Sequence, residues 1–204
     1  MNPALARLIA GHVFLHACMA GMRMAAPLLA LRQGHSAAAV GVLLALFALT
    51  QVFLALPAGR YADRRGLKRP VAFSVAAAAL GAGLAVAFPV FPVLCLSALM
   101  TGGATGAASI ALQRHVGRAA GSPTELKKVF SWLAIGPAVS NFLGPFSAGL
   151  VIDHAGFRAA FFLMALLPLA SWFWVRTTRE LPPVEVPAGQ ARPRTWDLVR
   201  EPVF

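Results

Sequence analysis

Three side chains in the first apolar stretch have types and spacing suited to handling a proton or an anion. His12, His16 and Arg23 are four and seven residues apart, so in a helix they project from one face. A charge inside an apolar span costs roughly 2.5–3.5 kcal/mol unless it faces water or a partner. Arg23 could therefore hold an anionic group, and His16 could exchange a proton. Alternatively, Arg23 extends to the headgroups and both histidines bond neighbouring carbonyls.

Two amides, Gln51 and Asn141, stand in later apolar runs. They could line the same cavity, or they could join neighbouring helices by hydrogen bonds. We predict a substrate or proton pathway from these five polar residues. The sequence has no HExxH, GxSxG or phosphate-binding glycine loop, and no paired carboxylates inside a span. We therefore predict no enzyme activity, no cofactor and no metal site.

The composition places these residues in a membrane. The chain is 58% hydrophobic and 12% charged, with a mean hydropathy of +0.71, whereas soluble domains carry about 25% charged residues. The net charge of +11 comes from short basic blocks between apolar runs. Membrane topology explains such blocks better than nucleic-acid binding does. We predict an all-α membrane protein whose partner is the lipid bilayer, with no nucleic acid.

Six apolar segments approach the roughly 20 residues that a helix needs to cross a ~30 Å hydrocarbon core. They are too long and too rich in Ala and Leu for the strands of a barrel. Gly121-Ser122-Pro123-Thr124 indicates a helix stop followed by a cap. The six predicted spans cover residues 5–30, 36–57, 70–88, 92–113, 129–151 and 158–175.

Basic residues predict the orientation of the spans. With the N-terminus in the cytoplasm, 15 of the 18 Lys and Arg fall on the inner side, which follows the positive-inside rule. Only Arg23, Arg32 and Arg158 lie elsewhere. We predict a six-helix bundle over residues 1–176, with both termini cytoplasmic. Residues 177–204 form a linker or tail, and its apolar end at Thr195–Phe204 resembles an interrupted approach to a seventh helix.

One pattern occurs twice, ninety residues apart. The first copy reads Ala58-Gly59-x-x-x-Asp63-x-x-Gly66-x-Lys68, and the second reads Ala148-Gly149-x-x-x-Asp153-x-x-Gly156-x-Arg158. Each copy follows the second span of a three-span set. Because three is odd, the copies face opposite sides of the membrane, which predicts two inverted three-helix repeats. In the simpler alternative, Gly and Asp only mark turns.

The sequence from Gly59 to Arg69 closely resembles the loop signature of the major facilitator superfamily, with Leu67 where that family usually has a basic residue. The resemblance implies half of that fold and a bacterial inner-membrane location. It also implies a cytoplasmic gate loop, in which Asp63 caps a helix of a second half and Arg69 joins an ion-pair cluster. The predicted gate residues are Gly59, Asp63, Arg64, Gly66, Lys68 and Arg69. Alternatively, this basic loop only anchors the topology.

Gly144-Pro145-Phe146-Ser147-Ala148-Gly149 is similar to the Gly-Pro signature in helix 5 of the antiporter branches, which favours export. The motif residues are Gly144, Pro145 and Gly149, and ordinary close helix packing is the alternative. Against export, Ala98 stands where many proton-coupled exporters have an arginine.

The resemblance implies membrane transport of a small-molecule substrate by alternating access, as secondary transport and proton-coupled efflux. It also implies a second six-helix half, which this sequence lacks. Three explanations stay open at this point. The chain is a truncated gene product, a homodimerising half-transporter, or a membrane subunit that kept the fold without transporting.

Overall fold

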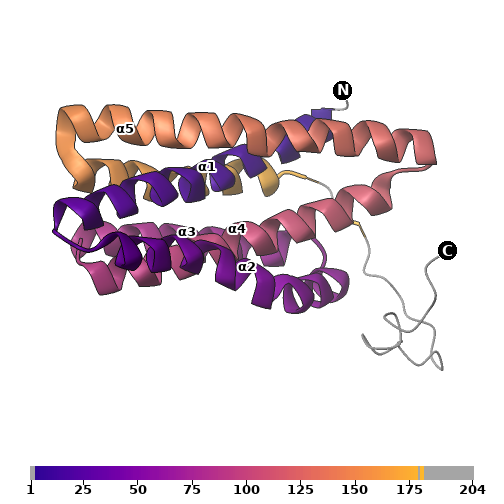
Figure 1. Ribbon diagram of the computed structural model, residues 1–204. Coiled ribbons are helices and arrows are strands. Elements are labelled where there is room, and N and C mark those ends of the chain that lie inside the picture. Colours follow the sequence, from indigo (N-terminus) through magenta and orange to yellow (C-terminus); the bar gives the residue numbers. More distant parts are fainter. Residues whose placement is uncertain (1–2, 179, 182–204) are drawn as a thin grey trace.

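The computed structural model describes residues 3–178, 180 and 181, and helices account for nearly all of this range (Figure 1). Each of its five helices is long and apolar enough to cross a membrane. They are α1 (Pro3–Arg32), α2 (Ala37–Arg65), α3 (Lys68–Ala87), α4 (Phe91–Ala119) and α5 (Pro123–Val175). The prediction of an all-α fold is confirmed. The predicted tail lies almost entirely outside the described residues.

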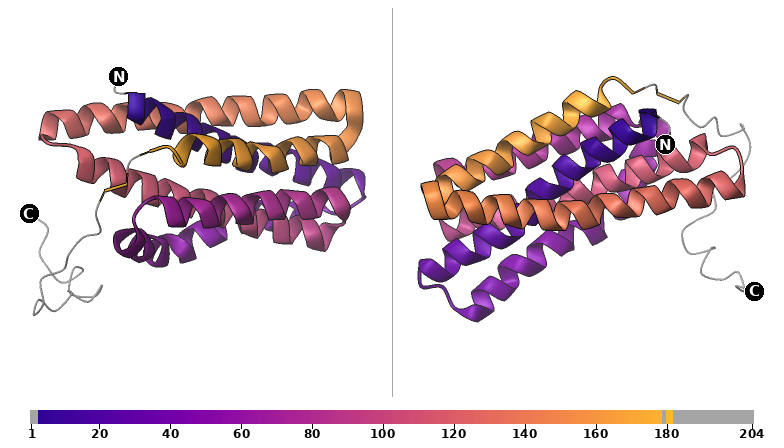
Figure 2. Two further views of the ribbon diagram at one scale, coloured as in Figure 1. Left: turned by 180° about the vertical axis from the view of Figure 1, so that it is seen from behind. Right: turned by 90° about the horizontal axis from the view of Figure 1, so that it is seen from above.

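The long helix α5 consists of two arms. At Gly156 the backbone leaves helical geometry, with φ 82° and ψ 176°. The ribbon reverses direction there, so the arms 123–155 and 157–175 run antiparallel (Figures 1 and 2). The predicted spans 129–151 and 158–175 therefore both fall within α5, one in each arm.

The segment Gly59–Arg69, predicted to be a loop, is mostly helical. The helix α2 continues to Arg65, and only Gly66 and Leu67 separate it from α3. The prediction was wrong because it ended the helix where the apolar residues end. Charged side chains can stay in water while the backbone keeps its hydrogen bonds, as the Gly66 N–H does to the Ala62 carbonyl at 2.9 Å.

The junction between α4 and α5 follows the predicted stop and cap. The Ser122 hydroxyl accepts a hydrogen bond from the Glu125 N–H at 3.2 Å, and Pro123 occupies the first turn of α5. However, α4 extends to Ala119, six residues beyond the predicted span, for the same reason as α2.

The helices run side by side along the length of the molecule (Figures 1 and 2). The α2–α3 and α4–α5 junctions and the start of α1 lie at one end, while the α1–α2 and α3–α4 junctions and the bend of α5 lie at the other (Figure 1). We call the first end the basic end, because residues 60–69 lie there. Helix α1 packs mainly on α5, α2 mainly on α4, and α3 on both α4 and α5.

Two glycines bring helix backbones into direct contact. A Cβ on Gly102 would lie 2.2 Å from the Phe47 carbonyl oxygen, at the crossing of α4 and α2. A Cβ on Gly144 would lie 2.5 Å from the Ala17 carbonyl oxygen, at the crossing of α5 and α1. In a membrane such close approach is what favours helix association, because lipid and side chains are equally apolar.

Candidate functional site: a charged turn and a polar helix face

The charged turn comprises residues 59–69, and its centre is an ion pair between two helices. Asp63 lies in the last turns of α2 and Arg114 in the last turns of α4. The Arg114 Nη1 donates to both carboxylate oxygens of Asp63. The Arg114 side chain is 47% exposed and the Asp63 side chain 39%, so water screens the attraction between them. Asp63 is therefore paired with a residue of this chain.

Gly59 makes room for this ion pair. It is buried, and a Cβ at its position would lie 2.9 Å from a terminal nitrogen of the Arg114 guanidinium. The arginine can therefore lie flat along α2 and reach Asp63 one helical turn further on. Arg69, to which the resemblance assigned an ion pair, is exposed and takes no part in this one.

Gly66 ends α2 and leaves space for an acidic side chain from beyond α5. Its φ is 74°, a region that favours glycine. The Glu180 Oε1 accepts a hydrogen bond from the Lys68 N–H at 3.0 Å, and it would lie 2.4 Å from a Cβ on Gly66. A carboxylate at the first residue of α3 also complements the helix dipole. Glu180 thus attaches the chain after α5 to the charged turn.

The second copy of the repeated pattern has the same backbone break. Gly156 has a φ of 82°, close to the 74° of Gly66. A Cβ on Gly149 would lie 3.6 Å from the Met24 methyl group, and Met24 precedes Arg114 by ninety residues. The Gly59–Arg114 contact thus has its counterpart at Gly149. In the second copy, the uncharged Met24 takes the place that Arg114 has in the first. An ion pair between the corresponding positions therefore forms only in the first copy.

Arg23 and Asn141 form a polar pair on the surface of the bundle. The Arg23 Nη2 donates to the Asn141 Oδ1 at 3.2 Å, and this bond joins α1 to α5. Both residues are exposed although both lie well inside apolar helices. The structure thus brings together two of the five predicted pathway residues.

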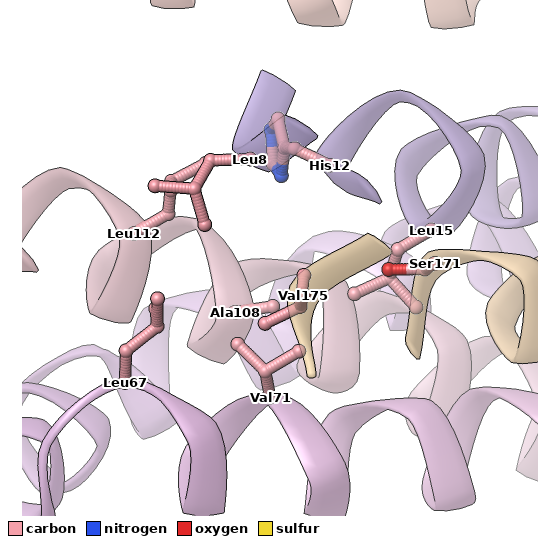
Figure 3. Close-up of a pocket in the computed structure, with 9 residues that line it drawn as sticks. All are labelled: Leu8, His12, Leu15, Leu67, Val71, Ala108, Leu112, Ser171 and Val175. Atoms are coloured by element: carbon pink, nitrogen blue, oxygen red, sulfur yellow. The ribbon is translucent and has the colours of Figure 1, made fainter. Parts of the chain in front are cut away.

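His12 lies apart from that pair, in the packed interior. Its ring is buried beside a cavity of only about 10 Å³, lined by α1, α3, α4 and the second arm of α5 (Figure 3). His16 is half-buried, its ring centroid is 5.7 Å from that of His12, and its Nδ1 is buried without a hydrogen-bond partner. Burial therefore differs along the face that the spacing predicted, since His12 is buried, His16 is half-buried and Arg23 is exposed.

Gln51 faces α4 rather than Arg23. Its Nε2 donates to the Phe47 carbonyl at 3.2 Å in its own helix. Its Cγ would lie 3.0 Å from a Cβ on Gly106, so the side chain packs in the α2–α4 contact. The amide thus packs against α4, while its hydrogen bond stays within α2 and joins no second helix.

The helix-5 motif lies against α1. Gly144 contacts the backbone of Ala17, while Pro145 is half-buried beside it. One turn earlier, the buried Ser140 hydroxyl donates to the carbonyls of Val13 and Gly136, at 3.1 and 2.7 Å. Gly144 is thus a point of close packing between α5 and α1.

Sequence reasoning missed two residues of the charged turn, Arg114 and Glu180. Arg114 is the first basic residue after the fourth apolar run, on the side of the membrane predicted for Asp63. That position could have indicated a partner. For Glu180 the sequence offered only an isolated acid after the last span.

Fold and site together define a polytopic α-helical membrane protein with glycine-mediated helix crossings, an ion-paired turn at its basic end and an arginine exposed within an apolar span. The comparison with known families is more specific. Residues 8–204 match the model of the Major Facilitator Superfamily, and the chain belongs to that family.

Two curated relatives and one solved structure are similar to parts of the chain. The class B tetracycline resistance protein of Escherichia coli is 33% identical over 144 residues, which cover 68% of this chain and 35% of that protein. The inner membrane transport protein YajR of E. coli strain K12 is 28% identical over 165 residues, or 77% of this chain and 36% of the relative. The chain thus spans about a third of each relative's length.

The solved structure is the in meso crystal structure of the POT family transporter PepTSo. It superposes with a TM-score of 0.75 over 91% of this chain and 40% of that one, at 15% identity. This likeness shows a shared fold.

Proposed function

We propose that this chain is one half of a secondary transporter that moves a small molecule by alternating access. In this proposal the two arms of α5 cross the membrane separately, giving six crossings in two inverted three-helix repeats. The matched backbone breaks at Gly66 and Gly156 support the repeats, as do the equivalent contacts of Gly59 and Gly149. Family membership supports the transport function.

The exposed Arg23–Asn141 pair is the observation that carries the proposal. A charge facing lipid from inside a span is costly, so this surface requires a water-filled cavity or another protein. Helix α2 also has much uncovered apolar surface, since only 11% of its most apolar stretch is buried. A second six-helix half placed over this face would enclose Arg23, which would then bind an anionic or strongly polar group of the substrate.

The charged turn is then a gate at the cytoplasmic side. The excess of Lys and Arg at the basic end supports that orientation, with both termini inside. The Asp63–Arg114 pair connects α2 to α4, and Glu180 connects the chain after α5 to α3. These links make the basic end one unit that can move against a second half.

We further propose that transport is efflux coupled to protons. The class B tetracycline resistance protein among the relatives supports efflux, as does the helix-5 motif. Ala98, where an exporter arginine was expected, is fully buried among other helices. A proton site would therefore have to be elsewhere, and the unpartnered Nδ1 of His16 is the best candidate.

The test is drug accumulation in E. coli that expresses the complete reading frame containing this chain, with any coding sequence downstream of Phe204. Tetracycline is the first probe, followed by a panel of toxic compounds in growth assays. We expect lower accumulation of at least one compound, reversed by a protonophore. Arg23→Ala should abolish the effect, while Lys128→Ala, which removes an exposed charge at the start of α5, should not. Unchanged export by Arg23→Ala would refute the role of the polar pair.

A further inference from the structure

An apolar groove runs between α2 and α3, with α4 as its floor. Helices α2 and α3 contact each other little, and each packs on α4 instead. The space between them has a volume of about 280 Å³. Its walls include Leu54 and Tyr61 from α2 and Phe73 and Ala77 from α3, with Met100 on the floor. Hydrocarbon fits such a lining, and a hydrated ion does not.

One mouth of this groove is basic. On α2 the lining residues Leu54, Ala58 and Tyr61 follow a spacing of four and three, and the next residue in that stripe is Arg65. On α3, Arg69 precedes the lining residue Phe73 by one turn. Both arginines are exposed, and neither has an ion-pair partner in the described part of the chain.

The nearest acid in sequence cannot neutralise these arginines. Both carboxylate oxygens of Asp63 already accept hydrogen bonds from Arg114 on α4. Glu180, the other acid at this turn, accepts a hydrogen bond from the Lys68 N–H and forms no ion pair with either arginine in the described part of the chain. Two cations therefore remain at the mouth of a hydrocarbon-lined groove. They would attract an anion that is attached to an apolar chain.

Tyr61 lies where the apolar and basic parts meet. It is the only tyrosine of the chain, and its ring packs edge-on against Phe73 with the centroids 6.0 Å apart. Tyrosine favours the boundary between hydrocarbon and headgroups, because its ring is apolar and its hydroxyl polar. This places the basic mouth at headgroup level and the groove at acyl-chain level.

We propose that this groove is a binding site for an anionic phospholipid. One acyl chain lies between α2 and α3, and the phosphate of the headgroup lies between Arg65 and Arg69. Basic pockets between membrane helices recognise anionic lipids through this combination of charge and apolar contact. The site requires only that the chain is embedded in a bilayer, so it does not depend on the proposed transport function.

The experiment uses the full chain in nanodiscs of phosphatidylcholine with a trace of lipid that carries a diazirine on its acyl chain. Two probes are compared, phosphatidylglycerol and phosphatidylcholine, with identical chains. After illumination, labelled peptides are identified by mass spectrometry. We expect phosphatidylglycerol to label groove residues such as Phe73 and Met100 with roughly 25-fold preference at low salt, or about fivefold for each arginine. Added salt should reduce the preference.

Paired variants identify the source of the preference. In Arg65→Gln/Arg69→Gln, the preference for phosphatidylglycerol should disappear while labelling by phosphatidylcholine persists. Lys127→Gln/Lys128→Gln is the matched control, because it removes two exposed charges at the same end of the bundle from the start of α5. In this control the preference should remain. Ala77→Phe fills the groove from α3 and should reduce labelling of Met100 by both probes.

Three results would overturn the proposal. Equal labelling by both lipids in the unaltered chain would indicate ordinary boundary lipid, and this comparison needs no variant. A preference that survives the double arginine variant would place the anion elsewhere. Groove residues protected from both probes, together with cross-linked dimers, would show that a second copy of the chain occupies the groove.

Discussion

Replacing Gly102 by alanine should separate α4 from α2, and the structure sets the size of the effect. The new methyl group would lie 2.2 Å from the carbonyl oxygen of Phe47 and 2.9 Å from its Cα and carbonyl carbon. Cβ atoms essentially never come within 3.0 Å of heavy atoms from elsewhere in a protein. The two backbones must therefore move apart by at least about 0.8 Å. A helix backbone cannot rotate out of the way as a side chain can.

Overpacking of this kind costs about 1–3 kcal/mol, and the backbone contact places Gly102→Ala in the upper half of that range. Gly83→Ala is the matched control, since Gly83 lies in α3 with nothing within 4 Å of its added methyl group. Alanine gains about 1 kcal/mol of helix propensity over glycine at both positions. That gain cancels in the comparison, so Gly102→Ala should be about 2–3 kcal/mol less stable than Gly83→Ala.

The free energy of unfolding is measured by titrating each variant with sodium dodecyl sulfate in mixed micelles and following helical circular dichroism. We expect destabilisation by Gly102→Ala and a neutral or stabilising effect of Gly83→Ala. If the two variants agree within about 0.5 kcal/mol, the backbone contact at Phe47 does not hold α2 against α4, and the account of helix association is refuted.

Two more predictions concern the charged turn and use the same titration. In a double-mutant cycle of Asp63→Asn and Arg114→Gln, the coupling should be at most about 1 kcal/mol and should fall with added salt, because both side chains are more than a third exposed; zero coupling at low salt would show that the pair does not form. Gly66→Ala should lower the free energy of unfolding more than Gly156→Ala does. Alanine is strained at the positive φ of both positions, but only Gly66 lies against Glu180. The excess should vanish in a Glu180→Ala background, and an unchanged excess would exclude Glu180 as its cause.

Local chemistry was enough to predict an all-α fold and where the apolar stretches lie. Gly66 and Gly156, which hold the same place in the repeated pattern, both have positive φ. The bilayer makes such prediction possible, because every buried backbone group must be bonded within its own helix. The residues at which the helices end were less predictable. Helix α2 continues through the charged residues Arg64 and Arg65. Hydropathy did not predict this, because it indicates which residues lie in the membrane and not which backbone groups are hydrogen-bonded.

The lateral arrangement of the helices is what only the tertiary structure decided. His12, His16 and Arg23 share one helical face by spacing, yet α5 covers His12 and leaves Arg23 exposed beside Asn141. Likewise, no local rule connects Asp63 to Arg114, fifty-one residues away on another helix. Such pairings depend on how each helix is rotated and on where two backbones cross. Those crossings are set by contacts between distant residues, and a single sequence does not reveal them.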